Sequence, residues 1–181
     1  MRSYKTEGII IKRNNFSEAD RILTVFTRNH GLIKVKAKGV RRINSRRASH
    51  IELLNFSHLS LYEGRSIPTL TEAVSIDTFE EIKKDLSKIG FAYHICELID
   101  GLCAAYQENR MVFSLILDTL EGLKISGSPS GIIKDFEIEL LVLLGFWNKN
   151  HKSDNIHFVI EGILERKLKT ARILPLFDYS L

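Results

Sequence analysis

Few residues of the kind that build metal or redox sites occur in this chain of 181 residues. Its only two cysteines are Cys96 and Cys103, and no Cys-x-x-Cys pair exists, which excludes a four-cysteine zinc site. They stand seven residues apart in a stretch with helical periodicity, too far for a disulfide on one helix. The six histidines are scattered at no ligand spacing. We therefore expect reduced cysteines, no metal and no cofactor.

Long hydrophobic segments are also missing. The longest apolar run, residues 140–146, is far shorter than the roughly 20 residues of a membrane-spanning helix. The amino terminus lacks an apolar segment followed by a small-residue cleavage site, so a signal peptide is not expected. These absences favour a soluble cytoplasmic protein that makes no contact with a membrane.

Sequence patterns of enzymes are absent as well. The chain has no GxSxG, HExxH, P-loop or GxGxxG pattern. Glu18 and Asp20 form a carboxylate pair, but such a pair beside Arg21 is more typical of a turn or an ion pair. Asp135 and Glu139 share a helix face without a third ligand, which favours a solvated face. We expect a protein without enzymatic activity.

Carboxylates are absent from residues 21–51, although the chain has 22 acidic residues in all. The same interval holds nine cations. Lys34, Lys36 and Lys38 alternate with apolar residues, the pattern of a strand with one buried face, and Gly39 leads into an arginine-rich loop. An unpaired row of cations complements a polyphosphate backbone, although a solvated face is the usual alternative. The candidate nucleic-acid-binding residues are Arg21, Lys34, Lys36, Lys38, Arg41, Arg42, Arg46 and Arg47.

The positive charge belongs to one half of the chain. Residues 1–79 carry 14 Lys+Arg against 7 Asp+Glu, a net +7, whereas residues 80–181 carry 12 against 15, a net −3. An anionic partner is therefore expected for the first half only. No Phe, Tyr or Trp lies between Thr27 and Asn55, so base stacking is not expected within the basic stretch. This pattern predicts phosphate contacts with weak sequence preference, to single- and double-stranded nucleic acid alike.

Hydrophobic periodicity predicts an α+β chain with two domains, residues 1–79 and 80–181. The first domain has period-2 segments separated by turn residues, and the second has helical spacing. The expected strands are 7–12, 21–27, 32–38, 51–62 and 69–76, and the expected helices are 80–90, 91–106, 112–125, 132–144 and 157–169. Five short strands with a wide gap after the third fit a small closed barrel of the OB type, with an SH3-like barrel as the competing topology. Gly90 is expected to end the first helix of an all-α bundle.

Three motifs in the first domain carry a family resemblance. An EADR turn at Glu18–Arg21, a T-x-x-x-G hairpin at Thr27–Gly31 and the loop AKGVRRINSR at Ala37–Arg46 follow EGIIIK and precede LYEG. This order resembles the RecO family of bacterial DNA repair proteins. FAYHICELID and LLVLLGF in the second half match more loosely.

The resemblance implies a recombination mediator with an OB-fold domain followed by a helical domain. Such proteins bind single- and double-stranded DNA, anneal complementary strands, and act with RecR to load RecA onto strands covered by single-strand-binding protein. The resemblance also implies that the helical domain binds the tail of single-strand-binding protein, and that the protein associates with the nucleoid. This sequence does not contain the four-cysteine zinc motif of many members, and compared with them a shortened helical half is expected. An RNA-binding or ribosome-associated OB-fold protein is the alternative that the same cations would serve.

Overall fold

The computed structural model describes residues 2–64, 66–127, 129–148, 155–170 and 174. The chain forms two compact units. The first comprises Met1–Thr78 together with Ala104–Arg110, and the second comprises Phe79–Cys103 and Met111–Leu181. The division into domains at residue 79 stays a prediction.

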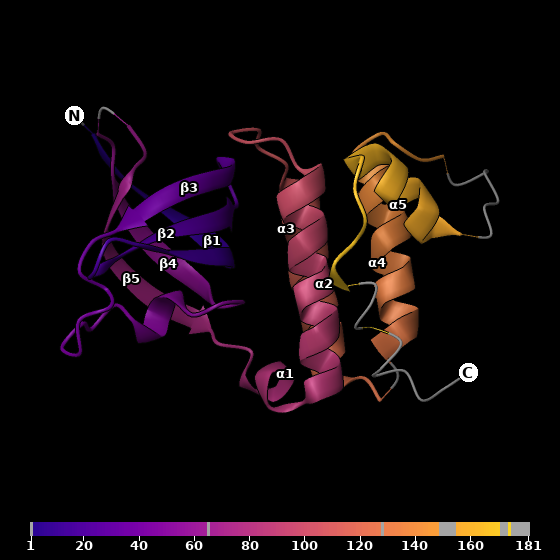
Figure 1. The fold of residues 1–181 in the computed structure, drawn as a ribbon, viewed down its shortest axis with the longest axis horizontal. Coiled ribbons are helices and arrows are strands. Elements are labelled where there is room, and N and C mark those ends of the chain that lie inside the picture. Colours follow the sequence, from indigo (N-terminus) through magenta and orange to yellow (C-terminus); the bar gives the residue numbers. More distant parts are fainter. Residues whose placement is uncertain (1, 65, 128, 149–154, 171–173, 175–181) are drawn as a thin grey trace. The chain divides into compact units, whose positions relative to one another are not determined.

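A closed five-stranded barrel forms the first unit (Figure 1). Its strands are β1 (Ser3–Phe16), β2 (Asp20–Thr27), β3 (Gly31–Ala37), β4 (Phe56–Tyr62) and β5 (Thr69–Asp77). The order around the barrel is β1-β2-β3-β5-β4, and β3 pairs with β5 in parallel while the other pairs are antiparallel. This order confirms the predicted OB-type barrel and rejects the SH3-like alternative.

Strand β1 is much longer than the predicted segment 7–12. Its first part pairs with β4 from Ser3 to Ile9, and its second part pairs with β2 from Gly8 to Phe16. A register shift between Ile10 and Lys12 lets one strand serve both partners. The polar residues between the expected strand and Phe16 continue the ladder with β2 as an exposed end of the strand.

The barrel interior is filled by aliphatic side chains from every strand. Two further members come from the long connection between β3 and β4: Val40, which is 2% exposed, and Ile51, which is fully buried. The connection is therefore fixed at both ends by the barrel core. The interior cluster comprises Ile10, Leu23, Val25, Ile33, Val35, Ala37, Val40, Ile51, Leu59, Leu61, Leu70 and Ala73.

A segment distant in sequence completes the first unit. Ala105 forms a parallel bridge with Leu32 at the start of β3, and the Tyr106 amide donates to the Leu32 carbonyl over 3.0 Å. Gly31, next to Leu32, has a φ of +62°, and the backbone of Gln107 lies directly over its α-carbon. The prediction of a helix through residue 106 was wrong, because this segment is used as an addition to the sheet.

The second unit is helical (Figure 1). Its helices are α1 (Glu80–Lys84), α2 (Leu86–Leu102), α3 (Arg110–Ile125), α4 (Pro129–Leu143) and α5 (Ile156–Leu164). Phe113, Phe136, Leu98 and Ile160 are among its buried side chains. No helix in the described part of the chain has the length and apolarity needed to cross a membrane.

The break between α1 and α2 falls at Asp85. Its carboxylate accepts hydrogen bonds from the amides of Ser87 at 2.9 Å and Lys88 at 3.1 Å, which is an N-cap. The prediction that Gly90 ends a helix was wrong. Gly90 is buried within α2, and the cap five residues earlier sets the boundary.

Candidate nucleic-acid interface

Residues 39–48, here called the cationic loop, follow β3 as a series of tight turns. Amides donate to carbonyls three residues earlier, from Arg42 to Gly39 at 3.2 Å and from Ser45 to Arg42 at 3.0 Å. The turn begins at Gly39, whose φ of +68° is readily adopted by glycine. The Arg41 amide also donates to the Ala19 carbonyl over 3.0 Å, which holds the loop against the β1–β2 turn. The cationic loop thus has an ordered backbone.

Asp20 fixes the entrance to this loop. Its Oδ1 accepts a hydrogen bond of 2.9 Å from the Gly39 amide, and its Oδ2 lies 3.4 Å from the Lys36 ammonium. The Gly39 hydrogen bond, followed by the contact with Lys36, lowers the pKa of the Asp20 carboxyl below its usual value. The structure therefore places Asp20 in the turn and ion-pair role that the sequence favoured. Lys36 also lies over the ring of Phe16, 4.7 Å from its centroid.

Arg47 spans the seam at which the barrel closes. Strands β3 and β5 share only the pair Lys36 and Thr69 in their register, supported by a 2.8 Å hydrogen bond from the Lys36 amide to Pro68. The Arg47 guanidinium donates to the Leu70 carbonyl at 2.7 Å and to the Lys38 carbonyl at 2.8 Å. These two carbonyls lie on opposite sides of the seam. Arg47 is thus a structural clamp in addition to a cation.

Replacing Arg47 by Ala should lower the stability of the protein by about 2 kcal/mol, because two carbonyls lose a charged donor at a short seam. Arg47→Lys should recover only part of this loss, since one ammonium lacks the fork that reaches both oxygens. Denaturant unfolding followed by circular dichroism measures the change. Arg46→Ala is the matched control, because Arg46 is exposed, and its effect should stay within about 0.5 kcal/mol. Equal effects of the two changes would contradict the clamp.

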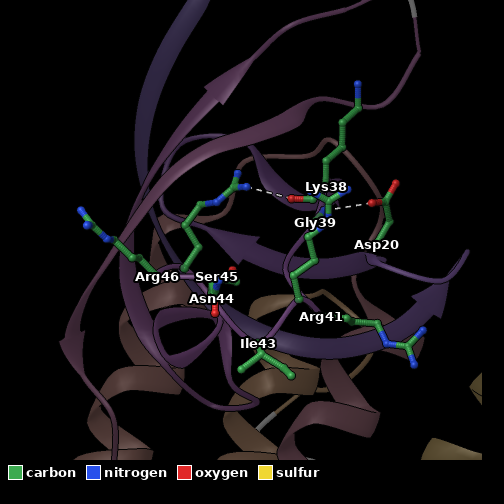
Figure 2. A pocket seen from close by; sticks show the side chains of 10 residues that line it. Asp20, Lys38, Gly39, Arg41, Ile43, Asn44, Ser45 and Arg46 are labelled. Atoms are coloured by element: carbon green, nitrogen blue, oxygen red, sulfur yellow. Dashed lines mark hydrogen bonds between the residues drawn. The ribbon is translucent and has the colours of Figure 1, made fainter.

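An open hollow of about 1090 Å³ lies over the cationic loop. Five of the eight predicted residues line it: Lys38, Arg41, Arg42, Arg46 and Arg47. Lys38, Arg41, Arg42 and Arg46 are exposed and form no salt bridge with the described residues, although Asp20 also lines the hollow and interacts electrostatically with Lys38. Figure 2 shows the charged ends of Lys38, Arg41 and Arg46 pointing away from one another. Diverging cations suit an extended polyanion better than one small anion.

The other predicted residues lie outside this hollow. Arg21, on β2, lies 3.8 Å from the Glu52 carboxylate, which also binds Arg13 at 2.5 Å. Lys36 is engaged by Asp20, as described above. Lys34 is exposed on β3. Of the three alternating lysines, Lys34 and Lys38 are exposed to solvent, whereas Lys36 is half-buried.

Two apolar side chains beside the cations were missed by the sequence analysis. Ile43, at the tip of the cationic loop, is fully exposed at 102%, and Phe16, at the end of β1, is 49% exposed. The only signal for Ile43 was an isolated aliphatic residue within a polar loop. Phe16 lies beyond the expected strand 7–12, and no pattern in the sequence marked it as exposed beside the cations. Both offer an apolar surface next to positive charge.

Comparisons with known proteins point in one direction. The family model "Recombination protein O N terminal" matches residues 1–79, and "Recombination protein O C terminal" matches residues 83–147. The chain is 39% identical over 145 residues to the DNA repair protein RecO of Roseiflexus sp. (strain RS-1). It is 36% identical over 161 residues to the DNA repair protein RecO of Dehalococcoides mccartyi (strain CBDB1).

The alignments cover a larger share of this chain than of the two relatives. The alignments cover 80% and 89% of this chain, but 51% and 64% of the two relatives. The chain thus spans about half to two thirds of the length of the curated relatives that it matches. The two family models match it in succession and together cover most of its length. The chain therefore belongs to the RecO family.

Proposed function

We propose that this protein acts in recombinational DNA repair as a DNA-binding recombination mediator without enzymatic activity. It binds single- and double-stranded DNA through the phosphates, anneals complementary strands, and assists RecA loading together with RecR on strands coated by single-strand-binding protein. The helical unit binds the tail of single-strand-binding protein. Membership of the RecO family, whose relatives carry the printed name DNA repair protein, supports the repair role.

The observation that carries the DNA-binding part is the cationic loop. Lys38, Arg41, Arg42 and Arg46 stand exposed on a backbone held by Val40 inside the barrel and by the Arg47 clamp. Charged side chains on an ordered backbone lose less conformational entropy on binding than charged side chains on a flexible segment. Their attraction to phosphates is independent of base sequence.

Annealing requires that two strands be held without hiding their base edges. Contacts confined to phosphates leave those edges available for pairing. The diverging cations in Figure 2 would contact phosphates at several points along a backbone. Phe16, half-exposed beside Lys36, offers one ring on which a base could stack. This surface is consistent with a protein that neutralises two strands and lets them pair.

Annealing of complementary strands coated with single-strand-binding protein tests the proposal. The protein should accelerate annealing well above the spontaneous rate, and the double variant Arg42→Ala/Arg46→Ala should lose most of this acceleration. Lys5→Ala/Lys12→Ala, which removes the same charge from exposed positions of β1 outside the hollow, should retain it. Competition of bound DNA by RNA at fixed salt belongs to the same experiment. Preferential displacement by RNA, without annealing, would replace the proposal by the RNA-binding alternative.

A further inference from the structure

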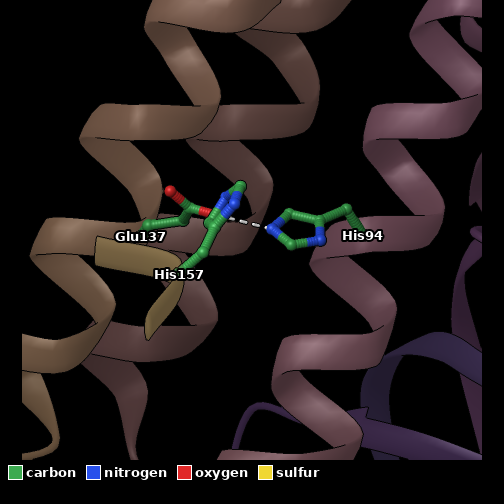
Figure 3. A group of neighbouring side chains, drawn as sticks. All are labelled: His94, Glu137 and His157. Atoms are coloured by element: carbon green, nitrogen blue, oxygen red, sulfur yellow. Dashed lines mark hydrogen bonds and ion pairs between the residues drawn. The ribbon is translucent and has the colours of Figure 1, made fainter. Parts of the chain in front are cut away.

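Three polar side chains from three helices meet inside the helical unit. They are His94 of α2, Glu137 of α4 and His157 of α5 (Figure 3). The Glu137 Oε1 lies 2.7 Å from the His94 Nε2 and 2.8 Å from the His157 Nε2. Each residue offers one ligand atom, and these two imidazole nitrogens and one carboxylate oxygen all lie within 4.8 Å of one another. Two histidines and a carboxylate are a common ligand set for zinc.

Burial makes this group unlike a surface ion pair. The side chains of His94 and Glu137 are 0% and 3% exposed, whereas that of His157 is 41% exposed. Burial by itself would raise the pKa of the Glu137 carboxyl, but the hydrogen bonds from His157 and His94 outweigh it and lower that pKa. The carboxylate is therefore ionised and points at two imidazoles. One side of the group, at His157, remains accessible to solvent.

The outer partner of His94 determines which ring nitrogen faces Glu137. The His94 Nδ1 lies 2.6 Å from the Thr170 hydroxyl, and that hydroxyl donates to the Glu97 carboxylate over 2.7 Å. A hydroxyl has one proton, so the Thr170 oxygen accepts from Nδ1–H of His94. With Nδ1 bound to Thr170, Nε2 is the ring nitrogen of His94 that faces the Glu137 oxygen. Partners that fix the tautomer of a histidine in this way accompany metal-bound imidazoles.

The His94 Nε2 lies 2.7 Å from the Glu137 Oε1, so these two atoms need a shared cation between them. One divalent ion at this position would bind His94, Glu137 and His157 together, with one donor atom from each of three helices. We propose that these three side chains bind a divalent transition-metal ion of the zinc class that fastens α5 to α2 and α4.

The distances require only a small adjustment. With zinc-to-ligand bonds of about 2.0–2.1 Å, tetrahedral ligands lie roughly 3.3 Å apart. The two nitrogen-to-oxygen distances of 2.7 and 2.8 Å would open by about half an ångström, a movement within reach of the Glu137 side chain. Water on the exposed side of His157 completes the coordination. This proposal departs from the sequence-based expectation of no metal, which rested on cysteines and on spacing along the chain.

Zinc binding to the purified full chain, first stripped with a chelator and dialysed, tests the inference. The wild-type protein should take up about one Zn²⁺ per chain, and saturating Zn²⁺ should raise the melting temperature by roughly 5–10 °C. Co²⁺ in place of zinc should give the visible absorption bands of a tetrahedral nitrogen–oxygen site. Absence of binding by equilibrium dialysis at about 100 μM Zn²⁺ would overturn the proposal.

Variants locate the ion. His157→Gln should weaken binding at least about 100-fold and remain folded, because His157 is partly exposed at the start of α5. His58→Gln, an exposed histidine of the barrel, should bind as the wild type does. Thr170→Val should weaken binding by about 10- to 100-fold through the tautomer of His94. Wild-type zinc affinity in the His157 variant would place the metal elsewhere and refute the assignment.

Discussion

A variant in which Lys38, Arg41, Arg42 and Arg46 are all replaced by Gln should bind DNA with a much flatter salt dependence. Each lost phosphate contact removes about 0.9 from the slope of log K against log salt for a duplex and about 0.7 for a single strand. Four contacts therefore remove about 3.6 or 2.8 from the slope. Between 50 and 200 mM salt, the affinity of the wild type for duplex DNA should therefore fall roughly 150-fold more than the affinity of the variant. Fluorescence anisotropy across a salt series measures both slopes.

The matched control removes four cations from the helical unit: Lys84, Lys134, Lys167 and Lys169, each to Gln. These lysines are exposed, and the control protein carries the same net charge as the loop variant. Its salt slope should stay near the wild-type value. The loop variant should also keep its melting temperature, because Val40 and Arg47 still hold the loop base. An unchanged slope in the loop variant would show that the basic stretch is only a solvated face.

Replacing Gly31 by Ala should destabilise the first unit by about 3 kcal/mol. The residue has a φ of +62°, which costs an L-residue about 1–2 kcal/mol. An added Cβ would lie 1.9 Å from the Gln107 carbonyl oxygen and 2.5 Å from its carbon, so main chain must move at a further cost of roughly 1–3 kcal/mol. Thermal unfolding should show a loss of roughly 10 °C.

Two other glycines separate the causes of this effect. Gly39 has a similar φ of +68° but only the Arg42 side chain nearby, 3.9 Å from an added Cβ, so Gly39→Ala isolates the conformational cost. Gly64→Ala should be nearly neutral, because nothing lies within 4 Å of its added Cβ. Trimming Gln107 to Ala should not rescue the Gly31 variant, since the clash is with main-chain atoms. An equal loss of stability in the Gly31 and Gly39 variants would show that the clash with segment 104–110 does not contribute.

Local patterns in the sequence account for much of the fold. Strands β2 and β3 were predicted from local hydrophobic patterns, with clear alternation in β3 only, and the loop after Gly39 was predicted from composition. The length of β1 did not follow, because its polar end near Asn14 is a strand only through pairing with β2. The boundary before α2 was missed because the Asp85 cap overrode the usual meaning of a glycine at position 90.

The positive charge of the candidate site could be predicted from the sequence, but the structural role of one of its arginines could not. A run of cations is visible in the sequence, whereas the clamp made by Arg47 depends on carbonyls at Lys38 and Leu70 that only the closed barrel brings together. The same reason hides the group of His94, Glu137 and His157. Residues 43 and 20 positions apart share no spacing pattern, and three helices must pack before their ring and carboxylate atoms meet.

The segment 104–110 has a consequence for the order in which a nascent chain acquires structure. Strand β5 ends at Asp77, yet the bridge from Ala105 to Leu32 cannot form until α2 has also been synthesised. At about 5–20 residues per second, residue 110 follows residue 77 by roughly two to seven seconds. During that interval the Leu32 edge of β3 lacks the strand segment that later covers it. An exposed edge of this kind is a template for pairing with a neighbouring chain, so crowded ribosomes on one message would favour dimers of the unfinished barrel.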